Sequence, residues 1–200
     1  TQPASGAPSL GTHYAPRART APAHANNASR QCASAVLLDP GFALAGAQLA
    51  HVYGLSYWFE YDLTPERLAQ MTRAAQEAAR LQPELAEALL AQGYVRYFGY
   101  REYESALKLF GQARQRLPND AEVLLTISYI KRRQGKWDEA VLLQAEALDR
   151  EPHNIRLLSE YSRTLMMLHG RLDEARTVLD RALNLTPDDS TLLSFKVSIS

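Results

Sequence analysis

The side chains with the chemistry for catalysis or metal binding are few in this sequence and lie far apart along the chain. Cys32 is the single cysteine, so an intrachain disulfide and a cysteine-rich zinc site are both excluded. The histidines share no spacing typical of metal ligands, and they are His13, His24, His51, His153 and His169. No glycine-rich phosphate loop, GxSxG or HExxH motif is present. We therefore predict no catalytic residue, no metal site and no cofactor.

Adjacent carboxylates are the recurring acidic feature of the chain. The pairs are Asp138–Glu139, Asp173–Glu174 and Asp188–Asp189. Two close carboxylates can act as a general acid and base, but these pairs stand at predicted helix starts, where negative charge complements the helix dipole. Because they recur together with other residues, they indicate a repeated architecture rather than a catalytic dyad.

Five prolines set the period of that architecture. Pro40, Pro83, Pro118, Pro152 and Pro187 are separated by 43, 35, 34 and 35 residues, and an alanine stands five residues before each one. A small residue stands ten residues after each of the first four prolines, namely Ala50, Gly93, Ser128 and Ser162. Small residues let two helices approach closely, whereas proline ends a helix. A period near 34 therefore predicts a repeated helix–turn–helix unit.

Local signals place the helix ends within this unit. Gly135 and Gly170 stand where the first helix of a pair should turn into the second. Thr64 followed by Pro65 predicts an N-cap and the first residue of a helix.

The segment 121–152, AEVLLTISYIKRRQGKWDEAVLLQAEALDREP, resembles the tetratricopeptide repeat, with Gly135, Trp137, Ala140, Ala147 and Pro152 at that family's spacings. The resemblance covers residues 26–200 and implies an all-α fold of helix–turn–helix repeats stacked as a right-handed superhelical solenoid. The expected organisation is a linker or disordered arm at 1–25 and the repeat array at 26–200. The array is expected to hold a half repeat at 26–40, repeats at 41–83, 84–118, 119–152 and 153–187, and a terminal helix at 188–200.

The last predicted helix ends in SFKVSIS and would expose Phe195, Val197 and Ile199. A further repeat would cover such residues, so we expect the chain to be a fragment of a longer protein. Self-association through this C-terminal helix is a second expectation.

In the tetratricopeptide family the first helix of each pair lines a concave groove that commonly takes an extended peptide. The resemblance thus implies a non-catalytic protein–protein interaction module with a protein or peptide partner. Counted from the preceding prolines, the lining positions give the candidate partner-binding residues His51, Tyr94, Tyr97, Tyr129, Arg132, Arg133, Arg163 and Met166. Tyrosine, arginine and methionine are common at interfaces. Packing against adjoining helices is the alternative for several of them, including Tyr94, Tyr129, Arg163 and Met166.

The family's carboxylate clamp needs lysines and asparagines on the same face. Seven residues after the prolines this chain instead has Ala47, Leu90, Leu125 and Ser159, so the clamp is absent. Aromatic residues gather in two windows, 53–61 and 94–103, which lie at corresponding places in adjacent repeats. We expect the two windows to meet, either as packing or as a partner pocket.

Charge and hydropathy exclude other classes of partner. The 22 basic and 22 acidic residues balance, which argues against a broad electrostatic grip on nucleic acid or on an anionic membrane. No apolar run reaches the roughly 18 residues that a transmembrane helix needs. A single cysteine favours a reducing compartment, so a cytoplasmic location is expected.

A different function is implied by the stretches DPGFALAGAQLAHVY and YWFEYDLTPERLA. They resemble repeat domains of bacterial multidomain signalling proteins, in which the repeats follow an effector domain such as a cyclase, a kinase or a DNA-binding domain. The alternative function is therefore that of a regulatory or self-association domain.

Overall fold

The computed structural model describes residues 21–168 and 170–199, and every regular element in this part of the chain is a helix. In chain order the helices are α1 (Ala21–Leu38), α2 (Ala43–Trp58), α3 (Pro65–Leu81), α4 (Ala86–Tyr94), the π-helical turn η1 (Val95–Gly99), α5 (Tyr103–Arg116), α6 (Ala121–Arg133), α7 (Trp137–Arg150), α8 (Ile155–Met166), α9 (Leu172–Leu185) and α10 (Ser190–Ser198). The helix α1 begins inside the segment 1–25 that was expected to be a linker, and residues 1–20 lie outside the described residues.

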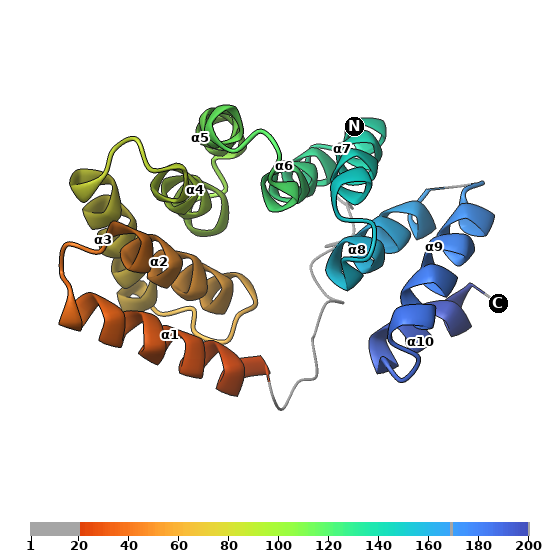
Figure 1. Cartoon of the computed structure of the whole chain (residues 1–200), viewed down its shortest axis with the longest axis horizontal. Coiled ribbons are helices and arrows are strands. Elements are labelled where there is room, and N and C mark those ends of the chain that lie inside the picture. Colours follow the sequence, from red (N-terminus) through yellow and green to blue (C-terminus); the bar gives the residue numbers. More distant parts are fainter. Residues whose placement is uncertain (1–20, 169, 200) are drawn as a thin grey trace, which may run out of the picture.

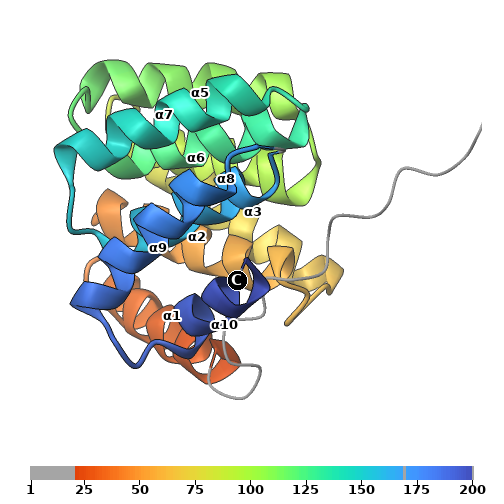
Figure 2. The same ribbon diagram turned by 90° about the vertical axis from the view of Figure 1, so that its right-hand side faces the viewer.

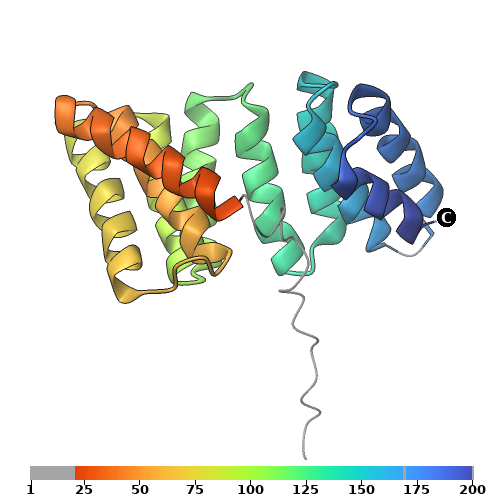
Figure 3. The same ribbon diagram turned by 90° about the horizontal axis from the view of Figure 1, so that it is seen from below.

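The helices pack in sequential pairs that form an arch (Figure 1). The first helices of the pairs, α2, α4, α6 and α8, lie on the inner side of the arch, and α3, α5, α7 and α9 lie on the outer side. Figure 3 shows the pairs side by side along the long axis of the molecule. Viewed along that axis in Figure 2, α5, α7 and α9 change direction from one to the next, as in a superhelix. The predicted all-α solenoid fold is thus confirmed.

Side-chain caps fix where several helices begin. The Thr64 hydroxyl accepts a hydrogen bond from the Arg67 amide at 3.2 Å, and Pro65 is the first residue of α3, as predicted. Asp120 caps α6 and Asn154 caps α8 in the same way. Because both inner helices start from an equivalent cap, their residues keep the same register on the inner face.

The turn between the two helices of each pair holds one residue in the left-handed conformation. Gly135 has φ of 74° and Gly170 has φ of 82°, which confirms the turns predicted from these glycines. The equivalent turns of the first two pairs use Glu60, with φ of 61°, and Arg101, with φ of 59°. A side chain at such a φ costs free energy that glycine does not, so these two turns carry strain.

Close packing within each pair depends on small residues, as the sequence predicted. Seven small residues have no exposed surface, namely Ala50, Ala78, Ala113, Ser128, Ala147, Ser162 and Ala182. At Gly93 in α4, an added Cβ atom would lie 2.3 Å from Cε1 of Phe110 in α5, and Phe110 is itself fully buried. The side chain of Phe110 therefore occupies the space that a larger residue at position 93 would need.

The core consists of two neighbouring clusters, one from α2 to α6 and one from α6 to α10, with Tyr129 and Leu143 packed against both. At the C-terminal end the expectation of three exposed residues is partly wrong. Ile199 is buried and Phe195 packs against the second cluster, whereas Val197 is 77% exposed. The reason is that α10 folds back onto α9, where Arg176 donates a hydrogen bond to the Ile199 carbonyl at 2.6 Å.

Two glycine-to-alanine substitutions test the close approach in the second pair. Alanine favours a helix interior over glycine by about 1 kcal/mol. In Gly93→Ala this gain should be outweighed by the collision with Phe110, for which overpacking costs about 1–3 kcal/mol. In Gly111→Ala the added Cβ meets nothing within 4 Å, so the gain should remain. Denaturant unfolding followed by circular dichroism should show the first variant destabilised and the second stabilised; equal shifts would contradict the packing.

Two further substitutions test the strained turns. Glu60→Gly should stabilise the protein by about 0.5–1 kcal/mol, because relief of the left-handed strain exceeds the added entropy of the unfolded chain. Gly135→Ala should destabilise it by about 1–2 kcal/mol for the converse reason. The midpoint of thermal unfolding measures both, and a lower midpoint for Glu60→Gly would show that the Glu60 side chain has a role that outweighs the strain.

Candidate functional site

The residues predicted to line the inner face at one repeated offset are His51, Tyr94, Tyr129 and Arg163. The first two stack on each other, with ring centroids 4.2 Å apart and planes 6° from parallel. The Tyr94 hydroxyl lies 3.1 Å from the Thr126 hydroxyl in α6, so it is satisfied within the protein. Burial lowers the pKa of His51 to about 4, which keeps this imidazole neutral at pH 7.

Tyr94 and Tyr97, both predicted as partner contacts, lie in the core. Their exposed fractions are 5% and 2%. Tyr94 stacks on Phe98 with ring centroids 5.2 Å apart, and Tyr97 packs against the same ring at 4.9 Å. The π-helical turn η1 begins after Tyr94 and includes Tyr97, so an offset counted along a regular α-helix no longer gives the direction of the Tyr97 side chain.

Arg132 and Arg163, also predicted to contact a partner, converge on a single buried carboxylate. Glu160 is only 5% exposed; it pairs with Arg163 on its own helix and with Arg132 of α6 at 3.4 Å. Arg132 also donates a hydrogen bond to the Thr164 hydroxyl at 3.0 Å. Burial is the main cause of a lowered pKa at Arg132, and the charge of Arg163 acts in the same direction. The structure therefore brings these two arginines together and fixes both of them.

A second ion pair joins the same two helices nearer their N-terminal ends. Arg156 of α8 lies 2.5 Å from Glu122 of α6, with half of the arginine side chain exposed. Arg156 also interacts with Tyr129, the remaining tyrosine of the predicted column, and burial raises the pKa of that tyrosine. The Arg156 guanidinium is thus held by Glu122, while about half of the side chain is exposed to solvent.

Apolar contact area lies at the carboxyl end of α8. Met166 is half-buried against the second core cluster, and the neighbouring Met167 is 47% exposed. Met166 therefore packs against the core with one part of its side chain and is exposed with the other.

The last predicted residue, Arg133, is exposed but belongs to a different cluster. Its guanidinium lies 5.0 Å from the ring centroid of Trp58, and the guanidinium of Arg101 lies 3.9 Å from the same ring. Trp58 packs in turn on Tyr97 at 4.8 Å and on Phe98 at 5.1 Å, so the two aromatic windows do meet, as expected. We call Trp58, Arg101 and Arg133 the arginine–tryptophan cluster.

Sequence reasoning missed Arg101 and Trp58 as parts of one site with Arg133. Arg101 stands in the turn after η1, outside any helical column, and Trp58 is the last residue of α2. One signal was available: Arg101 precedes Arg133 by 32 residues, close to one repeat. Counterparts one repeat apart are expected to be neighbours in a stacked array.

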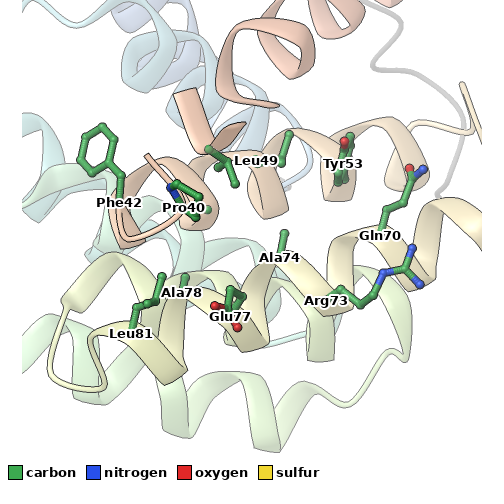
Figure 4. Close-up of a pocket in the computed structure, with 12 residues that line it drawn as sticks. Pro40, Phe42, Leu49, Tyr53, Gln70, Arg73, Ala74, Glu77, Ala78 and Leu81 are labelled. Carbon is green, nitrogen blue, oxygen red and sulfur yellow. The ribbon is translucent and has the colours of Figure 1, made fainter. Parts of the chain in front are cut away.

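An apolar groove of about 260 Å³ lies elsewhere, between α1, α2 and α3 (Figure 4). Leu49 and Tyr53 of α2 face Ala74, Ala78 and Leu81 of α3 across it. Its rim carries Gln70, Arg73 and Glu77 on α3, with Phe42 at one end. None of these residues is among the partner-binding candidates that the proline offsets predicted.

Metal and membrane sites can be assessed for the part of the chain that the structure describes. Within residues 21–168 and 170–199, no group of three or more histidine, cysteine or acidic side chains is arranged to hold a metal ion. In the same ranges no helix combines the length and the apolar character that crossing a membrane requires.

Known proteins share the fold over nearly the whole chain. A thermophilic TPR protein of Thermus thermophilus superposes with a TM-score of 0.72 at 19% identity, covering 88% of this chain and 91% of that one. YrrB, described as a TPR protein with an unusual peptide-binding site, gives a TM-score of 0.57 at 20% identity, covering 88% and 84%. MamA gives 0.53 at 17% identity, covering 84% and 86%. No curated protein sequence matches the chain.

The sequence of the C-terminal third agrees with this structural likeness. Residues 131–197 match the family model described as tetratricopeptide repeat. These residues comprise the last turn of α6, the helices α7 to α9 and most of α10. The chain is thus similar to the tetratricopeptide repeat family in sequence over residues 131–197, and its described part has the fold of tetratricopeptide repeat proteins.

Proposed function

We propose that the chain is a non-catalytic interaction module that binds an extended segment of a protein along the inner face formed by α2, α4, α6 and α8. The observation that carries the proposal is the pair of arginines, Arg156 and Arg163, held by carboxylates on this face. Both are only partly buried, with side chains 52% and 24% exposed. The guanidinium groups are held by Glu122 and Glu160, while part of each arginine side chain remains exposed.

Such fixed arginines suit recognition of a peptide. A guanidinium that is already oriented loses little conformational entropy when it binds a carboxylate or a backbone carbonyl. Met167 offers exposed apolar area beside them. An extended peptide could therefore place an apolar side chain on the methionine and polar groups on the arginines. The peptide-binding site mentioned for YrrB supports this function by structural likeness.

The sequence also suggested a regulatory domain and a self-association domain. The interpretation as a regulatory domain that follows an effector domain gains no support from any contact or comparison. Self-association through α10 stays a prediction: Leu193 and Val197 are exposed there, whereas Phe195 is partly buried and Ile199 is buried.

A matched pair of variants tests binding on the inner face. Arg156 pairs with Glu122 between the inner helices α8 and α6, and Arg114 pairs with Glu146 between the outer helices α5 and α7. Each ion pair joins neighbouring repeats and is partly exposed, so Arg156→Gln and Arg114→Gln should each change the free energy of unfolding by less than about 1 kcal/mol. Arg156→Gln should in addition weaken peptide binding by about 1–3 kcal/mol, as truncation of an interface arginine does.

The ligands for this test are peptides selected from a random displayed library against the unaltered chain. Isothermal titration calorimetry measures the affinity of each selected peptide for the unaltered chain and for both variants, and thermal melts control for folding. Equal losses in the two variants, or none in either, would contradict binding at the inner face. A selection that yields no binding peptide would count against the proposed function itself.

A further inference from the structure

Most arginines in the described part of the chain pair with a carboxylate, and the arginine–tryptophan cluster departs from this rule. Two ion pairs between neighbouring repeats have a separation of 32 residues in the sequence, namely Arg114 with Glu146 and Glu84 with Arg116. Arg101 and Arg133 stand at the same separation of 32 residues, but both members are cationic. Neither forms an ion pair with any acid among residues 21–168 and 170–199, and their mutual partner is the indole of Trp58.

Nearby acids are already committed to other partners. Glu102, next to Arg101, pairs with Arg96 at 3.0 Å. Glu104 accepts a hydrogen bond from Gln134, the neighbour of Arg133, at 2.7 Å. Two guanidinium groups thus converge on one ring with no counter-charge supplied by these neighbours. Burial is the first cause of a lowered pKa at Arg101, and the charge of Arg133 acts in the same direction.

The cluster is held in place although its arginines are exposed. Trp58 rests on Tyr97 and Phe98, which are both buried. The Arg133 guanidinium also lies near the Tyr97 side chain. The backbone at Arg101 has φ of 59°, a conformation that glycine adopts in the two later turns. The chain therefore keeps an arginine at a strained position, with its guanidinium set over a fixed ring.

We infer that the arginine–tryptophan cluster is a subsite for the carboxylate of an aspartate or glutamate side chain in an acidic peptide. Two guanidinium groups present several N–H donors, and a carboxylate accepts two parallel hydrogen bonds from such donors. The site lies at the carboxyl ends of α2 and α6, two inner helices, and beside η1. The inference rests on the proposed function in that it names the chemistry of one residue of the bound segment.

The rest of the surface favours a peptide over a nucleic acid as the source of the anion. Phosphate backbones are bound by many cations spread along a face. Here the chain has no net charge, and the other arginines of the inner face are paired with Glu122 and Glu160. A single uncompensated pair of guanidinium groups matches one acidic side chain rather than a polyanion.

Fluorescence of Trp58 tests the subsite directly. The chain has two tryptophans, so Trp137→Phe leaves Trp58 as the only indole fluorophore. In this background the probe is a capped tetra-aspartate peptide, and a capped tetra-asparagine peptide is the matched neutral probe. We expect a saturable change of Trp58 emission with tetra-aspartate only. The double variant Arg101→Gln, Arg133→Gln should bind tetra-aspartate at least about tenfold more weakly, since charge-assisted hydrogen bonds are lost.

Controls separate this inference from general electrostatics and from the proposed function. Arg73→Gln removes an exposed arginine from the outer helix α3 and should leave the response unchanged. Circular dichroism confirms that each variant is folded. No response to tetra-aspartate, or an equal response in the double variant, would overturn the subsite. Tighter binding of a single-stranded oligonucleotide, lost in the double variant, would assign the cluster to phosphate and also overturn it.

The two proposals fail independently. If the selected peptides depend on Arg156 but tetra-aspartate does not report on Trp58, the inner-face function stands and the subsite falls. If tetra-aspartate binds at Trp58 with the expected dependence on Arg101 and Arg133 while the selection yields no peptide, the subsite stands and the inner-face function falls.

Discussion

The close approach of the two helices in each repeat is the constraint on which the other features depend. At Gly93 the distance to Phe110 leaves no room for a single methyl group, and Ala50, Ser128 and Ser162 are completely buried at the equivalent positions. Because these contacts fix the spacing within a pair, every pair presents the same side of its first helix to the inside of the arch. A larger residue at one of these four small positions would displace the inner helix and the side chains on its inner face.

Regular stacking also fixes which residues meet between repeats. A side chain lies beside its counterpart about one repeat further along the chain, as for Tyr94 with Thr126 and Arg132 with Thr164, both 32 residues apart. Charges placed at such separations can neutralise each other in pairs. The ion pairs of Arg114 with Glu146, Glu84 with Arg116 and Arg156 with Glu122 follow from this geometry.

What repeats along the sequence could be predicted, and what breaks the repeat could not. The helix order, the buried alanines, the cap at Thr64 and the turns at Gly135 and Gly170 all follow from residues at fixed offsets. Counting offsets did not reveal that neighbouring rings cover Tyr94 and Tyr97, nor that η1 alters the helical register at Tyr97. It also could not foresee that Glu160 would hold two arginines, since that pairing depends on the distance between α6 and α8.

The departure at Arg101 and Arg133 shows why an irregular position can be more informative than a regular one. Two exposed unit charges repel by no more than about 1 kcal/mol in water at a separation of about 4 Å or more, and a cation over an indole near the surface recovers about 0.5–1 kcal/mol, so the cluster can exist without a ligand. A carboxylate at either position would have removed the repulsion and formed the ion pair found elsewhere at this separation. It would also have occupied the donors. Leaving both positions basic therefore keeps donors available at the carboxyl ends of α2 and α6, where the inner face meets the turns.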